Sequence, residues 1–235
     1  MSSAPKTTPN NLNKGVRMAT KKDKKVEEPT QEDQSDALEM LLEASAKEPP
    51  DNRLIALFGE IDEAKAGQLC FNLCLLASDK RYSAINPDDL NDGLKETVDP
   101  IQLMICSPGG NASEMFAIYD TMRVVRRECD IETFGVGKVM SAGVLLMAAG
   151  TKGKRQIGKN CRVMIHSVIG GFHGGIHNVE NEMDEIRWIQ EQYIKMLAEE
   201  SDVSRAQLKK LLQRKVNVYL SAEEAIEMGL ADIII

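Results

Sequence analysis

The sequence predicts an α/β fold with a mainly parallel sheet, and two observations support this prediction. From Asn52 onward, short apolar runs alternate with longer runs whose apolar residues recur at helical spacing. Strands that alternate with helices along a chain pair mostly in parallel, with the helices covering the sheet. Hydrophobic residues make up 43% of the 235 residues, which is enough for the core of one such domain.

The N-terminal stretch, residues 1–52, differs from the rest in composition. It is rich in Ser, Thr, Pro, Lys and Glu, basic at first and acidic after Val26. Such a segment buries too little apolar surface to order itself, so we expect a largely disordered extension. A short amphipathic helix is predicted at 37–47, ended by Pro49 and Pro50. The first 22 residues lack acidic side chains, so a transit peptide stays an alternative.

The first predicted strand of the folded part is the buried run Leu54–Phe58. Asp62 then caps a helix over the run AKAGQLCFNLCLLAS, whose apolar residues share one side. The polar segment Asp79–Val98 contains Asn-Pro-Asp-Asp and is predicted to be a surface loop.

A second strand, Ile101–Cys106, is closed by the turn Ser107–Gly110. The helix that follows presents one apolar face, made of Met115, Ile118, Tyr119, Met122 and Val125. The remaining predicted elements are a helix over Ser113–Arg127, a strand over Ile131–Val136, a helix over Ser141–Ala149, a strand over Arg162–His166, and helices over Asn178–Glu200, Arg205–Arg214 and Ala222–Met228.

Composition excludes several classes of protein. The 29 Lys and Arg against 36 Asp and Glu give a net charge of −7, and aromatic residues make up only 4%, so a nucleic-acid partner is not expected. The longest strongly apolar stretch, Ala142 to Gly150, is about half a membrane span, so no membrane partner is expected. The five cysteines lack paired spacing, which favours a reducing compartment.

Two residues stand out as candidates for chemistry. Ser141 lies where a strand meets a helix of small residues, beside the unpaired N–H groups and positive end of that helix. His166 ends the strand RVMIH. The alternative reading of these residues is that Ser141 is an N-cap and His166 a histidine whose hydrogen bonds are satisfied.

No cofactor or metal is predicted for this chain. Neither a phosphate-binding GxxxxGK[ST] loop nor a GxGxxG turn after a strand occurs. Cys70 and Cys74 share a helix face, and His173 and His177 lie close in sequence, but neither pair has the further ligands that a metal site requires.

Six short strings, in one order, resemble the ClpP family, the proteolytic subunit of the ATP-dependent Clp protease. They are SPGG at 107–110, IYDTM at 118–122, GKVMSAG at 137–143, AAGTKGKR at 148–155, RVMIH at 162–166 and LSAEEAIEMGLAD at 220–232. The resemblance covers residues 53–235. It implies the ClpP/crotonase-like spiral of repeated β-β-α units, with a protruding handle helix at about 168–200 that includes Trp188.

The resemblance also implies a reaction. Ser141 aligns with the nucleophile of the family and His166 with its general base. The backbone N–H groups of Gly110 and Ala142 align with the donors of the oxyanion hole. The chain is therefore expected to be a serine-type endopeptidase that hydrolyses unfolded polypeptides through an acyl-enzyme.

The third member of the triad departs from the family. The family has an acid three residues before LSA, and this chain has Asn217. An Asn carbonyl can orient the imidazole but offers no full negative charge to the imidazolium, which predicts slower catalysis or a site completed on assembly. Two alternatives stay open: a catalytically weak or inactive structural subunit of a mixed ring, and a crotonase-type enzyme acting on acyl-CoA.

The partners implied by the resemblance are identical or paralogous subunits in stacked heptameric rings, a tetradecamer that hides Ser141 in a chamber. An AAA+ unfoldase of the ClpX, ClpA or ClpC type would hydrolyse ATP and deliver unfolded proteins. Gln102 and Met104 replace tyrosines that help to form the family's docking pocket, so the chain departs from the family where the ATPase would bind. The expected compartment is the cytoplasm, with a plastid or other organelle stroma as the alternative.

Overall fold

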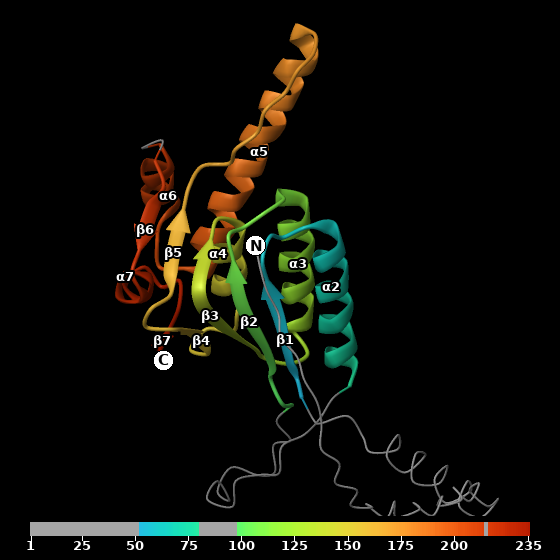
Figure 1. Cartoon of the computed structure of the whole chain (residues 1–235), viewed down its shortest axis with the longest axis vertical. Coiled ribbons are helices and arrows are strands. Elements are labelled where there is room, and N and C mark those ends of the chain that lie inside the picture. Colours follow the sequence, from blue (N-terminus) through green and yellow to red (C-terminus); the bar gives the residue numbers. More distant parts are fainter. Residues whose placement is uncertain (1–51, 80–97, 214–215) are drawn as a thin grey trace, which may run out of the picture. The chain divides into compact units, whose positions relative to one another are not determined.

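The computed structural model, which describes residues 52–79, 98–213 and 216–235, contains one sheet of seven strands (Figure 1). Five parallel strands follow the order β1-β2-β3-β4-β7, and β5 lies between β3 and the antiparallel β6. The strands are β1 Leu54–Phe58, β2 Ile101–Ser107, β3 Ile131–Met140, β4 Arg155–Ile157, β5 Arg162–Ile165, β6 Val218–Leu220 and β7 Ile233–Ile234. The predicted α/β class with a mainly parallel sheet is confirmed.

The helices lie against this sheet and beyond it. Figure 1 shows α2 and α3 side by side along β1 and β2, and the N-terminal half of α5 extending away from the sheet. The protruding helix is therefore present. The helices are α2 Glu63–Ser78, α3 Ala112–Val125, α4 Ala142–Ala148, α5 Ile176–Glu200, α6 Arg205–Leu212 and α7 Ala222–Glu227.

Local sequence signals explain where several helices begin. Asp62 caps α2 as predicted, and its Oδ1 accepts a hydrogen bond from Lys65 N at 2.9 Å. Ser221 and Glu224 form a reciprocal capping box at the start of α7. The apolar face predicted for the second helix is buried in full, and these side chains join α3 to the core.

The first strand differs from its prediction as a buried run. Only Leu57 is buried, while Leu54 and Phe58 are exposed. The reason is topological, since among the described strands β1 lies at the edge of the sheet and pairs only with β2. An apolar run does not by itself distinguish a central strand from an edge strand.

The third strand is longer than predicted. It continues past Val136 and through Gly137, whose φ of 63° permits a bend, as far as Met140. Before the bend β3 pairs with β4, and after it β3 pairs with β5. This change of partner brings the end of β3 next to the end of β5.

Several other segments differ from the prediction or lie outside the described residues. The strands β4, β6 and β7 are too short to give a pattern and were not predicted. The Gly-rich segment before α5 has no regular structure over 166–175. The predictions for residues 1–51, including the helix at 37–47, and for the loop at 80–97 lie outside the described residues.

Among the described helices, none is long and apolar enough to cross a membrane.

A buried ion pair ties the C-terminal segment to the sheet. Arg155, which is 3% exposed, donates from Nε to Asp232 Oδ2 at 2.8 Å. Burial by itself would raise the pKa of Asp232, but the hydrogen bonds and charge of Arg155 outweigh it and hold this pKa below its ordinary value. The pair therefore stabilises the folded state when Asp232 is ionised.

Asp232→Asn should lower the free energy of unfolding at pH 7 by about 2–3 kcal/mol, because Arg155 stays buried without its counter-charge. For a chain of this size that corresponds to about 5–10 °C in Tm. Because the folded pKa is the lower one, the contribution is complete above the ordinary value of 3.8 and is lost as the pH falls through the folded pKa. Thermal melts at pH 7 and in acid measure this difference.

Asp184→Asn is the matched control, since its ion pair with Arg187 is exposed on α5. We expect no measurable change in Tm for it. An equal, pH-independent loss for both variants would contradict the role given to Asp232.

Candidate active site

The carboxyl ends of four strands meet at one edge of the sheet. Ligands of parallel α/β sheets bind in the crevice outside these ends. The segment after β1 ends at Ile61, which forms a parallel bridge with Gly110 in the turn after β2. Ser141 follows β3, and His166 follows β5. Residues far apart in sequence are thereby brought to one place.

Ser141 has a strained backbone. It is the only non-glycine residue with a positive φ in the described ranges, at φ 53° and ψ −121°. Its N–H donates to Met164 O at 2.8 Å, and its carbonyl accepts from Val144 N at 3.0 Å. The sharp turn from β3 into α4 presents the hydroxyl at a helix start, as the nucleophile of a hydrolase requires.

The hydroxyl of Ser141 does not cap the helix. Ser141 occupies the N-cap position of α4, yet its side chain makes no capping hydrogen bond within the part of the chain that the structure describes. The hydrogen bond that an N-cap serine would make to the backbone of α4 is therefore missing, which argues against the N-cap alternative.

The two glycines of the SPGG turn are required by close packing. A Cβ at Gly109, whose φ is 100°, would lie 2.6 Å from Ser141 Cβ and 3.1 Å from its Oγ. A Cβ at Gly110 would clash with the backbone of Ile61. The turn after β2 therefore lies directly against the serine.

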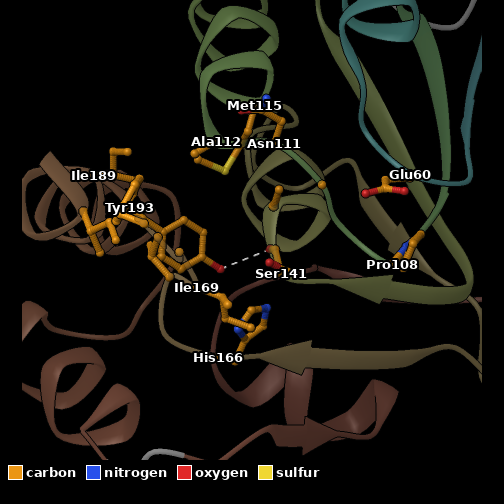
Figure 2. Close-up of a pocket in the computed structure, with 16 residues that line it drawn as sticks. Glu60, Pro108, Asn111, Ala112, Met115, Ser141, His166, Ile169, Ile189 and Tyr193 are labelled. Carbon is orange, nitrogen blue, oxygen red and sulfur yellow. Dashed lines mark hydrogen bonds between the residues drawn. The ribbon is translucent and has the colours of Figure 1, made fainter. Parts of the chain in front are cut away.

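A cavity of about 570 Å³ opens at this edge, and Ser141, His166, Gly110 and Ala142 all line it (Figure 2). Figure 2 shows Ser141 near the centre, with Tyr193 on one side and His166 below. The other lining residues are Glu60, Pro108, Asn111, Ala112, Met115, Val168, Ile169, Gly170, Phe172, Ile186, Ile189 and Tyr193.

Two backbone N–H groups beside Ser141 are left without an acceptor. Within the described ranges, neither Gly110 N nor Ala142 N donates a hydrogen bond, whereas the N–H groups of Gly109 and Asn111 both do. Ala142 N belongs to the first turn of α4, where the N–H groups of a helix are unpaired and its positive end lies. Both groups belong to residues that line the cavity.

Asn217 does not line this cavity. It is exposed and immediately precedes β6. The antiparallel register pairs Ile165 with Val218, so the next pair outward is His166 with Asn217. The two residues thus lie at neighbouring strand ends, but no hydrogen bond joins His166 to Asn217 or to Ser141 among the described residues.

Several lining residues were not predicted as part of the site. Tyr193 is 5% exposed, and its hydroxyl donates to Ser141 O at 3.2 Å. Burial raises the pKa of Tyr193 far above its ordinary value, so the phenol keeps its proton. Met115 was identified only as a core residue of its helix. The apolar face of α5 was the one signal for Tyr193, and it does not distinguish a core tyrosine from a site tyrosine.

The candidate metal ligands are not brought together. His173 and His177 are both exposed, and Cys74 on α2 is exposed as well. Over 52–79, 98–213 and 216–235, no three His, Cys, Asp or Glu side chains gather closely enough to hold a metal ion.

Comparison with known proteins decides the family. The family model described as Clp protease matches residues 93–235, more than half of the chain. The chain belongs to the Clp protease family. It is also 33% identical over 183 residues to the ATP-dependent Clp protease proteolytic subunit 2 of Mycolicibacterium paratuberculosis, covering 78% of this chain and 82% of that protein.

Membership confirms the resemblance seen in the sequence, and the fold agrees with it. This Clp protease chain is a proteolytic subunit of the serine peptidase type. Members of this family form rings and act with Clp ATPases in general. The match gives no support to the crotonase-type alternative.

Proposed function

We propose that this Clp protease chain is an endopeptidase with Ser141 as its nucleophile and His166 as its general base. It cleaves unfolded polypeptides inside a closed ring. One observation carries the proposal: the strained Ser141 and His166 line one cavity, together with the two N–H groups that have no acceptor.

The proposed reaction uses these groups in two steps. Ser141 Oγ attacks the peptide carbonyl carbon as His166 takes the hydroxyl proton, and the N–H groups of Gly110 and Ala142 bind the oxyanion. Collapse of the tetrahedral intermediate breaks the C–N bond, and His166 returns the proton to the leaving amine. Water, activated by His166, then hydrolyses the acyl-enzyme.

Substrate side chains would enter between α3 and α5. Met115, Ile186 and Ile189 give this side of the cavity an apolar surface. An apolar side chain next to the scissile bond suits such a surface, because its burial removes apolar area from water. Longer substrates would lie along the turn after β2, where glycine allows close approach of another backbone.

We also propose stacked rings and an AAA+ partner. Trp188 is 53% exposed and packs edge to face on Phe116, with ring centroids 6.0 Å apart. Ile176 and Met183 are exposed on the same projecting helix. Apolar side chains on a projecting helix favour a contact between subunits. An unfoldase would supply unfolded protein and consume the ATP, and the cytoplasm is the proposed compartment.

A fluorophosphonate probe tests the peptidase directly. It phosphonylates an activated serine with loss of fluoride, so the purified particle should gain one adduct per subunit, mapped to Ser141 by mass spectrometry. Ser141→Ala should lose the adduct, while Ser113→Ala, a change of the same type in the first turn of α3, should keep it. No adduct in an intact particle would overturn the proposed activity.

A second function is favoured by Asn217 alone. A subunit with Asn in place of an acid at position 217, and with no hydrogen bond from His166 to Asn217 in the described chain, suits a structural subunit of a mixed ring. In that case labelling is absent from the homomeric particle. It would also be absent from this chain after co-assembly with an active paralogue.

Assembly gives a separate prediction. Met183→Asp and Trp188→Asp each place a charge on the exposed face of α5 and should split the double-ring particle into smaller ones. Native mass spectrometry measures the particle, with the exposed change Glu185→Ala as control. Met183 makes the test independent of the Phe116 contact. An unchanged particle for both Asp variants would remove the proposed role of α5.

A further inference from the structure

The carbonyl of Ser141 is held by two donors. Val144 N donates to it at 3.0 Å from within α4, and the hydroxyl of Tyr193 donates to it at 3.2 Å from α5, the dashed line in Figure 2. Within the described residues, this carbonyl is the only hydrogen-bond partner of the Tyr193 hydroxyl. The hydroxyl of this buried tyrosine therefore binds one backbone atom of the site, the carbonyl oxygen of Ser141.

That carbonyl belongs to the same peptide group as the Ala142 N–H. A peptide group is planar and almost always trans, so its C=O and N–H point in opposite directions in one plane. Fixing the direction of Ser141 O therefore fixes the direction of Ala142 N–H. The backbone at Ser141 is strained, and a strained peptide keeps its orientation only when its surroundings hold it.

We propose that Tyr193 is a positioning residue, whose hydroxyl fixes the Ser141–Ala142 peptide and thereby aims the Ala142 N–H at the oxyanion. This inference rests on the proposed function, because it assigns Ala142 N–H to the oxyanion hole. Tyr193 does not touch the substrate carbonyl in this role. It acts through the peptide plane and through polarisation of that peptide by the added hydrogen bond.

The surroundings of Tyr193 suit this role. Tyr193 is 5% exposed and belongs to the hydrophobic core cluster of buried residues, so its hydroxyl has little freedom to move. The phenol stays protonated at any working pH, and the donor is therefore always present.

Tyr193→Phe tests the proposal, because it keeps the ring and removes only the hydroxyl. Loss of a direct oxyanion donor costs about 10²–10³-fold in kcat, so loss of an indirect one should cost on the order of ten-fold. KM for an unstructured peptide should change little. A peptide boronate, whose tetrahedral adduct places an oxygen in the oxyanion hole, should bind more weakly by the same factor as kcat falls.

Binding of the uncleaved peptide supplies the reference. Measured in a Ser141→Ala background, its affinity should be the same with Tyr193 or Phe at position 193. Tyr119→Phe is the matched control, since it removes another buried hydroxyl, one that donates to Glu200 at 3.0 Å. It should lower Tm while leaving kcat and the boronate affinity unchanged.

Three results would overturn the inference. Wild-type kcat and boronate affinity in Tyr193→Phe would show that the hydroxyl does not position the peptide. An equal loss of boronate and uncleaved-peptide affinity would show a general structural effect. A parent chain that neither cleaves peptide nor binds the boronate would refute the proposed function itself, and the inference with it.

Discussion

His166→Ala should lower kcat/KM for an unstructured peptide by about 10²–10⁴-fold, the usual contribution of a positioned general base. Without the imidazole, Ser141 Oγ loses the base proposed to take its proton, and the leaving amine loses the donor proposed to return it. His166 lines the cavity and is partly exposed, so the change should leave the fold and the particle intact.

His177→Ala is the matched control, because it removes the same side chain from an exposed position on α5. Its activity should equal that of the parent. The rates are measured on a fluorogenic peptide after native mass spectrometry has shown equal particles. A fall of the same size in both variants would mean that His166 is not the base.

Asn217→Asp should raise the rate of peptide hydrolysis by about ten-fold or more. Residue 217 immediately precedes β6, one position beyond the pair of Val218 with Ile165, so a carboxylate there would lie near His166 and stabilise its imidazolium as it forms. Asn217→Ala should fall below the parent, because an orienting carbonyl is lost. The order Asp, Asn, Ala in decreasing rate is the expected result.

Asn178→Asp serves as the control for charge alone, since it makes the same chemical change at an exposed position of α5. Its rate should equal the parent rate. Equal rates with Asp, Asn or Ala at position 217 would show that this position does not act on His166 in the working particle.

The sequence predicted where single helices and strands lie along the chain better than it predicted which elements lie next to each other. The extent of β1 and the buried face of α3 followed from apolar spacing, because each depends on contacts within one element. The exposure of β1 depends on which strand lies beside it, and the length of β3 depends on its change of partner near Gly137. Spacing along the chain does not encode either fact.

For the site too, the sequence indicated single residues but not the contacts between them. Ser141 and His166 carried their own signals, a serine at a strand–helix junction and a histidine at a strand end. The free N–H groups and the Tyr193 hydrogen bond depend on backbone geometry at Ser141, which residue type does not reveal. Asn217 was found only through the family pattern, and the register of β5 and β6 gives its place beside His166.

A peptide chloromethyl ketone with an apolar residue next to its reactive end measures whether Ser141 and His166 act on one substrate. The serine adds to its carbonyl while the histidine is alkylated by its methylene, with loss of chloride. Mass spectrometry of the assembled particle should find one such adduct per subunit on His166, and none in Ser141→Ala. An adduct absent from His166, or equally present without the Ser141 hydroxyl, would contradict a shared catalytic site.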